Sequence, residues 1–271
     1  MPFSHFIAIR KKFAPLILFV LVWLVAFFLP FSVLAQSNQR DDMGRRQGQW
    51  QGTHPNGQTR FTGQFIDDQP AGTFRYFNPD GTARLNLYYN LASDTVKVEF
   101  FHRNGRNLAV GQFVNRQRAG LWTFFSPTGV KVSENSYLNG QIHGSFLVFY
   151  PSGTVAESVE YSEGKKNGKW RKFFENGSLR LEAHYENDRL HGPFVAYHSN
   201  GNVMMRAEYY DNVLHNQRIL FTEGGEVISK QSYEKGDLIG ERIFIHLAEE
   251  PAIPLQPSND PVLEMIRSGI H

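Results

Sequence analysis

Cysteine is absent from this chain of 271 residues. Its absence excludes disulfides, thiolate metal sites, a cysteine nucleophile and a lipid-modified N-terminal cysteine. Any fold must therefore be held by non-covalent packing. The chain has the material for a core, since 41% of its residues are hydrophobic and 14% are aromatic.

Long apolar runs are scarce, but one lies near the N-terminus at residues 16–29. Basic residues 10–12 precede it, and small residues at Val33 and Ala35 follow it. This order predicts a secretory signal peptide over residues 1–35 that is cleaved before Gln36. We therefore expect an exported protein, periplasmic or extracellular.

An uncleaved membrane anchor formed by residues 13–34 is the alternative. The apolar run before Pro30 is shorter than the ~20 residues that a spanning helix needs, which favours cleavage. The alternative would place the protein on a membrane through this segment.

An excess of either charge is also lacking. Residues 1–35 hold three of the 28 basic residues and none of the 26 acidic ones, which leaves 25 basic against 26 acidic side chains. Nucleic-acid binding requires clustered Lys and Arg that displace counterions, so we expect no nucleic-acid partner. We expect membrane contact, if any, only through an uncleaved signal.

The sequence contains a 24-residue repeat. One glycine column is unbroken over eight copies that fill residues 48–239, and a second is interrupted only at Val96 and Asn216. The unbroken column is Gly57, Gly81, Gly105, Gly129, Gly153, Gly177, Gly201 and Gly225. The interrupted column is Gly48, Gly72, Gly120, Gly144, Gly168, Gly192 and Gly240. A third column is always aromatic, from Phe65 to Tyr233.

Turn residues show what each copy is. The unbroken glycines end tetrapeptides such as HPNG, NPDG and SPTG, which favour a type I turn with a positive-φ glycine in a bulge. Ten residues later stand pairs such as Asn139-Gly140 and Asn187-Asp188, typical of two-residue hairpin turns. We predict an all-β fold, a repeat array of eight 24-residue β-hairpins forming one long twisted antiparallel meander sheet.

Pairing outward from Asn187-Asp188 predicts the register of neighbouring strands. Tyr185 would then lie beside Leu190, and Leu181 beside Phe194. One face becomes apolar and the other mostly polar. The interrupted glycine column would fall in strand interiors, where a bulky ring can lie over each glycine.

The pattern G-x-W-x-x-[FY]-[FY]-x-x-G-x-[LV]-x(5)-[FY], seen in GKWRKFFENGSLRLEAHY at residues 168–185, resembles MORN repeats. It more closely resembles the bacterial MORN variant of YwqK-type antitoxin proteins. The resemblance covers about residues 48–246 and implies stacked β-hairpins. The third copy departs from it at Val96 and Val98, and the eighth at Asn216 and Arg218.

The domain organisation follows from these segments. We predict a signal peptide over residues 1–35, a polar linker over 36–47 and a MORN-like hairpin domain over 48–246. Residues 247–271 form a proline-rich tail that we expect to be disordered.

Catalytic motifs are missing from the repeats. The sequence contains no nucleophile elbow, phosphate loop, zinc-protease motif or dinucleotide fingerprint. Histidines recur in columns, but neighbouring copies lie about 10 Å apart, too far for zinc ligands to converge easily. We expect no catalytic residue, no metal and no cofactor.

Aromatic side chains are the remaining candidates for function. They fall in two columns that share the apolar face, and they either cover the sheet as a core or leave part of that face open for a partner. The candidate partner-binding residues are Trp122, Phe146, Trp170, Phe194, Tyr137, Tyr161, Tyr185 and Tyr209.

The predicted function is a non-catalytic exported repeat protein that acts as a binding scaffold for a protein or cell-surface partner. One alternative, implied by the resemblance, is an antitoxin or immunity protein that masks a toxin. Another is a polysaccharide-acting enzyme, which would need a deep cleft with two carboxylates about 5 to 10 Å apart.

Overall fold

The computed structural model describes residues 37–245. The predicted signal peptide and the predicted tail therefore lie outside the described residues. Nineteen strands are present: β1 Gln39–Arg40, β2 Arg46–Thr53, β3 Thr59–Ile66, β4 Gln69–Phe77, β5 Ala83–Tyr89, β6 Thr95–Phe101, β7 Asn107–Val114, β8 Gln117–Phe125, β9 Lys131–Leu138, β10 Gln141–Phe149, β11 Val155–Ser162, β12 Lys165–Phe173, β13 Leu179–Glu186, β14 Arg189–Leu190, β15 Gly192–Tyr197, β16 Val203–Tyr210, β17 Val213–Phe221, β18 Val227–Glu234 and β19 Asp237–Ile243. No helix among residues 37–245 is long and apolar enough to cross a membrane.

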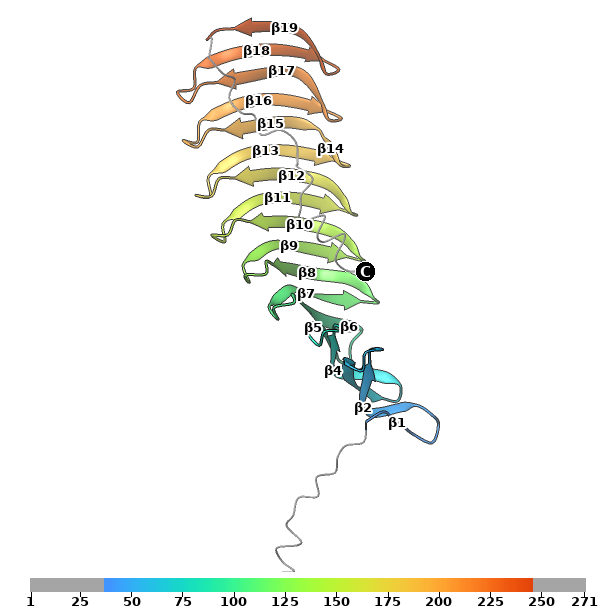
Figure 1. The fold of residues 1–271 in the computed structure, drawn as a ribbon. Helices are drawn as coiled ribbons and strands as arrows, with labels where there is room; N and C mark the ends of the chain where they lie inside the picture. Colours follow the sequence, from blue (N-terminus) through green and yellow to red (C-terminus); the bar gives the residue numbers. More distant parts are fainter. Residues whose placement is uncertain (1–36, 246–271) are drawn as a thin grey trace, which may run out of the picture. The chain divides into compact units, whose positions relative to one another are not determined.

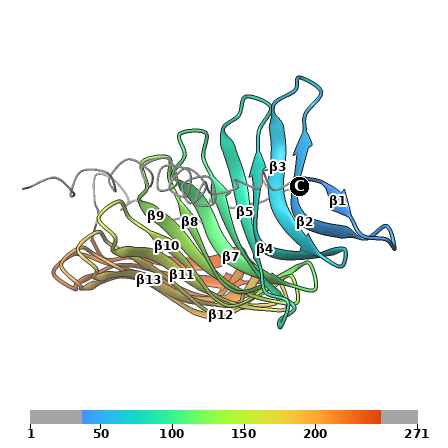
Figure 2. The ribbon, with the colours of Figure 1, turned by 90° about the horizontal axis from the view of Figure 1, so that it is seen from below.

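All strands belong to one sheet in which neighbouring strands pair antiparallel. β14 and β15 follow one another in the same row, and both pair with β13. Figure 1 shows them stacked in chain order from β1 to β19, with the strand direction turning along the stack. Figure 2 shows that the sheet is bent rather than flat, as expected when so many twisted strands pair in one sheet. The predicted all-β meander of hairpins is confirmed.

The glycine turn within each hairpin has the predicted geometry. Gly177 has φ 85°, and its N–H donates to the carbonyl oxygen of Phe174 at 2.9 Å. The eight glycines of this column have φ between 82° and 88°. Glycine is the residue that adopts such angles without strain, which explains why the column is unbroken.

The second turn joins one hairpin to the next. Asn187 and Asp188 have φ 49° and 69°, the positive pair of a type I′ turn, whose twist matches that of the flanking strands. The exception is the connection from the second copy to the third, where five residues, 90–94, connect β5 to β6. The third copy is the one that begins with Val96 in place of the column glycine.

The register beyond the second turn differs from the prediction. Tyr185 pairs with Leu190 as predicted, but Leu181 pairs with Ala196 and not with Phe194. Two extra residues on the β14–β15 side form a bulge in which Gly192 has φ 87°. The predicted pairing was wrong because this glycine column marks a bulge in a left-handed conformation.

The same conformation recurs in the interrupted glycine column. Positive φ is found at Gly48, Gly72, Gly120, Gly144, Gly168, Gly192 and, in place of a glycine, Asn216. A Cβ built on Gly192 meets no atom within 4 Å, so no ring covers it. The prediction that aromatic rings lie over these glycines was therefore wrong for this column.

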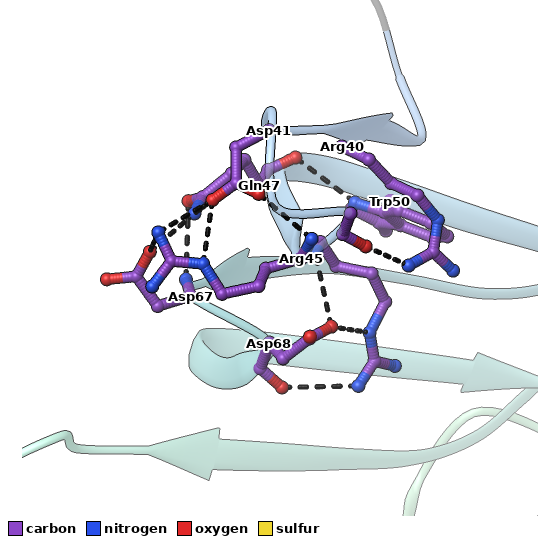
Figure 3. Close-up of polar contacts among 9 residues, drawn as sticks. Arg40, Asp41, Arg45, Gln47, Trp50, Asp67 and Asp68 are labelled. Atoms are coloured by element: carbon purple, nitrogen blue, oxygen red, sulfur yellow. Dashed lines mark hydrogen bonds and ion pairs between the residues drawn. The ribbon is translucent and has the colours of Figure 1, made fainter.

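The sequence placed residues 36–47 in a polar linker, but residues 39–40 form β1 and residues 46–47 begin β2, with a turn between them. Asp41 accepts hydrogen bonds from the backbone N–H and the Nε of Arg45 at 2.9 and 2.8 Å. Arg45 also pairs with Asp67 at 3.0 Å, and Arg46 pairs with Asp68 at 2.8 Å (Figure 3). This network ties the turn between β3 and β4 to the loop between β1 and β2 at the N-terminal edge of the sheet.

The N-terminal network is expected to depend on pH. Burial raises the pKa of Asp41, but hydrogen bonds from Arg45 and Gln47 outweigh it and lower the pKa from 3.8 to about 2. A carboxylate with a depressed pKa stabilises the fold above its unfolded pKa of about 4 and loses that contribution as pH falls towards 2. We expect the protection factors of the Met43 and Arg45 amides, which correct for the intrinsic pH dependence of exchange, to fall in that window, because both N–H groups donate to Asp41. Asp41→Asn should abolish the transition, and Asp42→Asn should leave it unchanged.

Histidines bridge consecutive hairpins. The Nε2 atom of His54 lies 3.0 Å from the carbonyl oxygen of Phe77, and the Nε2 atom of His102 lies 2.9 Å from the carbonyl oxygen of Phe125. His198 repeats the contact with Phe221 at 3.0 Å, and the Tyr150 hydroxyl donates to Phe173 at 2.8 Å. These side chains therefore join neighbouring turns at every second copy. Across residues 37–245, no group of three or more His, Asp or Glu side chains is placed to hold a metal.

Candidate binding face

The two faces of the sheet differ in chemistry. We call the side that carries the Trp/Phe and Tyr columns the ladder face, and the opposite side the polar face. In hairpin β12–β13, Trp170 lies across from Ala183 on the ladder face. On the polar face Arg171 lies across from Glu182, and their Nε and Oε2 atoms are 2.6 Å apart.

Each ring of the Trp/Phe column contacts the Tyr or Phe ring fifteen residues later. The centroid separations are 6.1 Å for Trp122–Tyr137, 5.8 Å for Phe146–Tyr161, 5.5 Å for Trp170–Tyr185 and 5.4 Å for Phe194–Tyr209. Contacts also cross between copies, as between Trp170 and Phe194 at 6.3 Å. The two predicted columns thus lie side by side on one face as a ladder of tilted and edge-to-face pairs, whose buried residues form two clusters that divide between Tyr137 and Phe146.

The ladder is buried. Trp122 is 0% exposed and Trp170 1%, and all eight predicted partner-binding residues are buried except Tyr209, which is half-buried. Basic side chains cover several rings: Lys172 lies 5.3 Å from the Trp170 centroid and Lys166 lies 5.0 Å from that of Tyr185. Among residues 37–245 these rings therefore form the hydrophobic core on the ladder face. That they bind a partner stays a prediction.

Small residues let the rings lie flat. A Cβ built on Gly111 would lie 2.2 Å from the Trp122 ring, and one on Gly63 would lie 2.4 Å from the Phe74 ring. Gly111 is the cross-strand partner of Val98, which is fully buried. The glycines beneath rings are therefore these strand glycines, outside both 24-residue columns.

Four side chains on the ladder face have buried polar atoms without a hydrogen-bond partner among residues 37–245: Ser133, Asn135, Tyr185 and Arg218. Burial raises the pKa of the Tyr185 hydroxyl far above its usual value. Arg218 occupies the position of a ladder ring in the eighth copy, a departure visible in the sequence. Nothing in the sequence indicated that its guanidinium nitrogens would be buried.

The polar face carries an exposed aromatic cluster that the sequence reasoning missed. Tyr210 is 57% exposed, and its ring lies 4.8 Å from that of His191 and 6.1 Å from that of His215. Val213, its cross-strand partner, is exposed as well. A signal was present, because the tyrosine pair Tyr209-Tyr210 puts one ring on each face.

Comparison with solved structures finds short, partial likenesses. A crystal structure of an S. aureus TarM mutant in complex with Fondaparinux, alpha-GlcNAc-glycerol and UDP matches at 16% identity with a TM-score of 0.22. The match covers 44% of this chain and 19% of the TarM chain. A crystal structure of TarM matches at 16% identity and a TM-score of 0.21, over 45% of this chain and 20% of that one. The chain thus spans about a fifth of the length of these proteins.

No curated protein matches the sequence. The family model described as "MORN repeat variant" matches three segments, residues 142–163, 166–187 and 190–212. They start 24 residues apart and coincide with hairpins β10–β11, β12–β13 and β14–β16. Residues 142–212 therefore consist of MORN repeat variants.

Proposed function

We propose that the protein is a non-catalytic exported scaffold that binds a partner protein through its polar face. The observation that carries this proposal is Tyr210, a large ring left 57% exposed at the end of β16 while the ladder rings are buried. Binding hot spots are enriched in tyrosine, and a ring already held in place loses little conformational entropy when it binds. His191 and His215 flank the ring with groups that donate and accept hydrogen bonds.

The proposal places the partner on the face opposite to the one that the sequence suggested. Ladder rings such as Trp170 could contact a partner only after their covering side chains move. Tyr210 needs no such rearrangement. Export rests on the predicted signal peptide, and N-terminal sequencing of the secreted chain, with Gln36 expected as the first residue, tests that part.

A narrower candidate is an immunity protein that masks a toxin. It rests on the resemblance of the repeats to YwqK-type antitoxins, and the match of residues 142–212 to MORN repeat variants supports the type of repeat. The predicted signal favours an exported immunity protein over a cytoplasmic antitoxin. Protection of a toxin-expressing cell by this chain would support it.

Substitution at Tyr210 tests the scaffold proposal. Partners captured from a cell-envelope extract by the wild-type chain are titrated against Tyr210→Ala and against Leu121→Ala, an equally exposed apolar residue on the same face. We expect Tyr210→Ala to weaken binding by about 30-fold or more, as loss of an anchor aromatic does, with unchanged melting. Equal binding by the wild type and Tyr210→Ala would contradict the proposal.

A further inference from the structure

The N-terminal edge of the sheet is closed by the chain itself. A short segment that includes β1 runs along β2, where the N–H of Asn38 donates to the carbonyl oxygen of Gln49 at 2.8 Å and Gln39 pairs with Gln47. The side chain of Asn38 also accepts a hydrogen bond from the N–H of Gln51 at 2.8 Å. These contacts occupy backbone groups of β2 that an added strand would need. The N-terminal edge is therefore blocked against further strand pairing.

The C-terminal edge is different. β19 is the last strand of the stack in Figure 1, and within residues 37–245 it pairs with β18 alone. All of its residues are exposed, including Leu238 at 50%, Ile239 at 64% and Ile243 at 47%. A strand of this length with exposed apolar side chains is a template for pairing with another strand.

The charges on β19 are left unbalanced by β18. On the polar face Asp237 lies across from Glu234, and Arg242 lies across from Lys230, so like charges stand opposite one another at both ends of the strand pair. Like charges in that arrangement destabilise a sheet, although Lys235 in the adjoining turn offsets part of the acidic end. Both Asp237 and Arg242 are exposed, and neither forms an ion pair with another of residues 37–245.

We propose that β19 pairs antiparallel with β19 of a second copy, so that two chains form one continuous sheet through their C-terminal edges. The acidic end of each β19 then lies against the basic end of the other, and Asp237 of each copy faces the partner's Arg242. A two-fold axis perpendicular to the sheet, passing between Ile239 and Gly240, creates both contacts at once. The same axis keeps polar face beside polar face.

The order of charges selects a second copy over an unrelated strand. An antiparallel partner satisfies both ends of β19 only if its own charges run from acidic to basic, and β19 itself has that order. The ring centroid of Phe244 lies 4.9 Å from Cζ of Arg242 and 6.0 Å from Nζ of Lys230, which holds the basic end on the polar face. Because the N-terminal edges are blocked, such a pair cannot grow into a longer filament and closes as a dimer.

The dimer would make the polar face bivalent. Tyr210 lies in β16, three strands from β19, so the two copies of this ring would stand seven strand spacings apart, roughly 34 Å along the sheet. A partner with two sites at that spacing would bind more tightly than either site alone allows. Bivalency rests on the proposed function, whereas the pairing of β19 does not depend on it.

Charge reversal in the mature full-length chain tests the pairing, with sedimentation equilibrium as the measurement. We expect the wild type to be a dimer. Asp237→Arg and Arg242→Asp should each raise the dimer dissociation constant by about 10-fold or more, because two like-charge contacts replace two opposite-charge contacts. An equimolar mixture of the two variants should form a heterodimer close to the wild type in affinity, since every contact between the copies is again between opposite charges.

The mixture separates the proposal from simple unfolding, because a heterodimer forms only if both variants are folded. Asp42→Arg, an exposed charge reversal at the N-terminal edge, is the matched control and should leave the dimer unchanged. A wild-type chain that sediments as a monomer would overturn the proposal. So would variants that remain monomeric when mixed, or an Asp42→Arg chain that is weakened as much as Asp237→Arg.

A disulfide tests the position of the two-fold axis without changing a charge. Because the chain has no cysteine, the thiol of the variant Gly240→Cys can form a disulfide only between copies. A Cβ at Gly240 meets no atom within 4 Å, and the proposed axis brings the two Cα atoms within the ~4.4–6.8 Å that a disulfide spans. We expect a covalent dimer after mild oxidation, and about tenfold less of it with Asp42→Cys. No covalent dimer, or equal amounts from the two variants, would contradict the pairing of β19 with its copy.

Discussion

Replacing Trp170 with alanine is expected to lower the free energy of unfolding by about 3 to 5 kcal/mol, the usual loss when a fully buried large ring is removed. The indole is 1% exposed, packs on Tyr185 and Phe194, and donates from Nε1 to Glu157 at 2.5 Å. Its removal leaves a cavity in the middle of the sheet, where the strands on both sides keep the site from collapsing. Urea titration followed by tyrosine fluorescence and by circular dichroism measures the loss.

Trp50→Ala is the matched control, because Trp50 holds the same column position in the first copy. It is half-buried and contacts a single neighbouring ring, Phe65 at 5.8 Å. We expect a clearly smaller loss there. Equal losses at Trp50 and Trp170 would show that the burial of Trp170 does not set the cost of its removal. A loss at Trp170 below ~1 kcal/mol with weakened partner binding would mean that the ladder is an open binding surface rather than a core.

Much of the fold could be predicted because the same turn and strand patterns recur in every copy of the repeat. Eight copies of the Gly177-type turn and six or more copies of the second turn set the strand ends, and the alternation of apolar residues sets the faces. The bulge at Gly192 could not be predicted, since a strand glycine is equally compatible with a covering ring and with positive φ. The two possibilities shift the pairing of Leu181 by two residues without changing its face.

The candidate site was less predictable than the fold. The sequence identified the ladder residues and brought Trp170 and Tyr185 to one face correctly, but exposure depends on what covers a face. A pattern of period two assigns each side chain to a face. It does not predict whether the flexible side chain of Lys166 or Lys172 will lie across the ring of Tyr185 or Trp170. For the same reason the exposure of Tyr210 became evident only from the structure.

Gly111→Ala is expected to cost about 1 to 3 kcal/mol of stability, the range for overpacking a filled core. Gly111 has an ordinary strand φ, so backbone strain is not the reason. The added Cβ would lie 2.2 Å from Cδ2 and 2.4 Å from Cε2 of Trp122. The indole must therefore lift, and in doing so it would lose contacts with Phe113 and Tyr137.

The control and a second background isolate the ring as the cause. A Cβ on Gly240 meets nothing within 4 Å and its φ is not positive, so Gly240→Ala should change the free energy of unfolding by less than ~0.5 kcal/mol. In a Trp122→Leu background the smaller side chain leaves room for the methyl group, and Gly111→Ala should become nearly neutral. This non-additivity is the expected sign of direct contact. If Gly111→Ala costs the same in the Trp122→Leu background as in the wild type, the clash with the indole is not what requires glycine at this position.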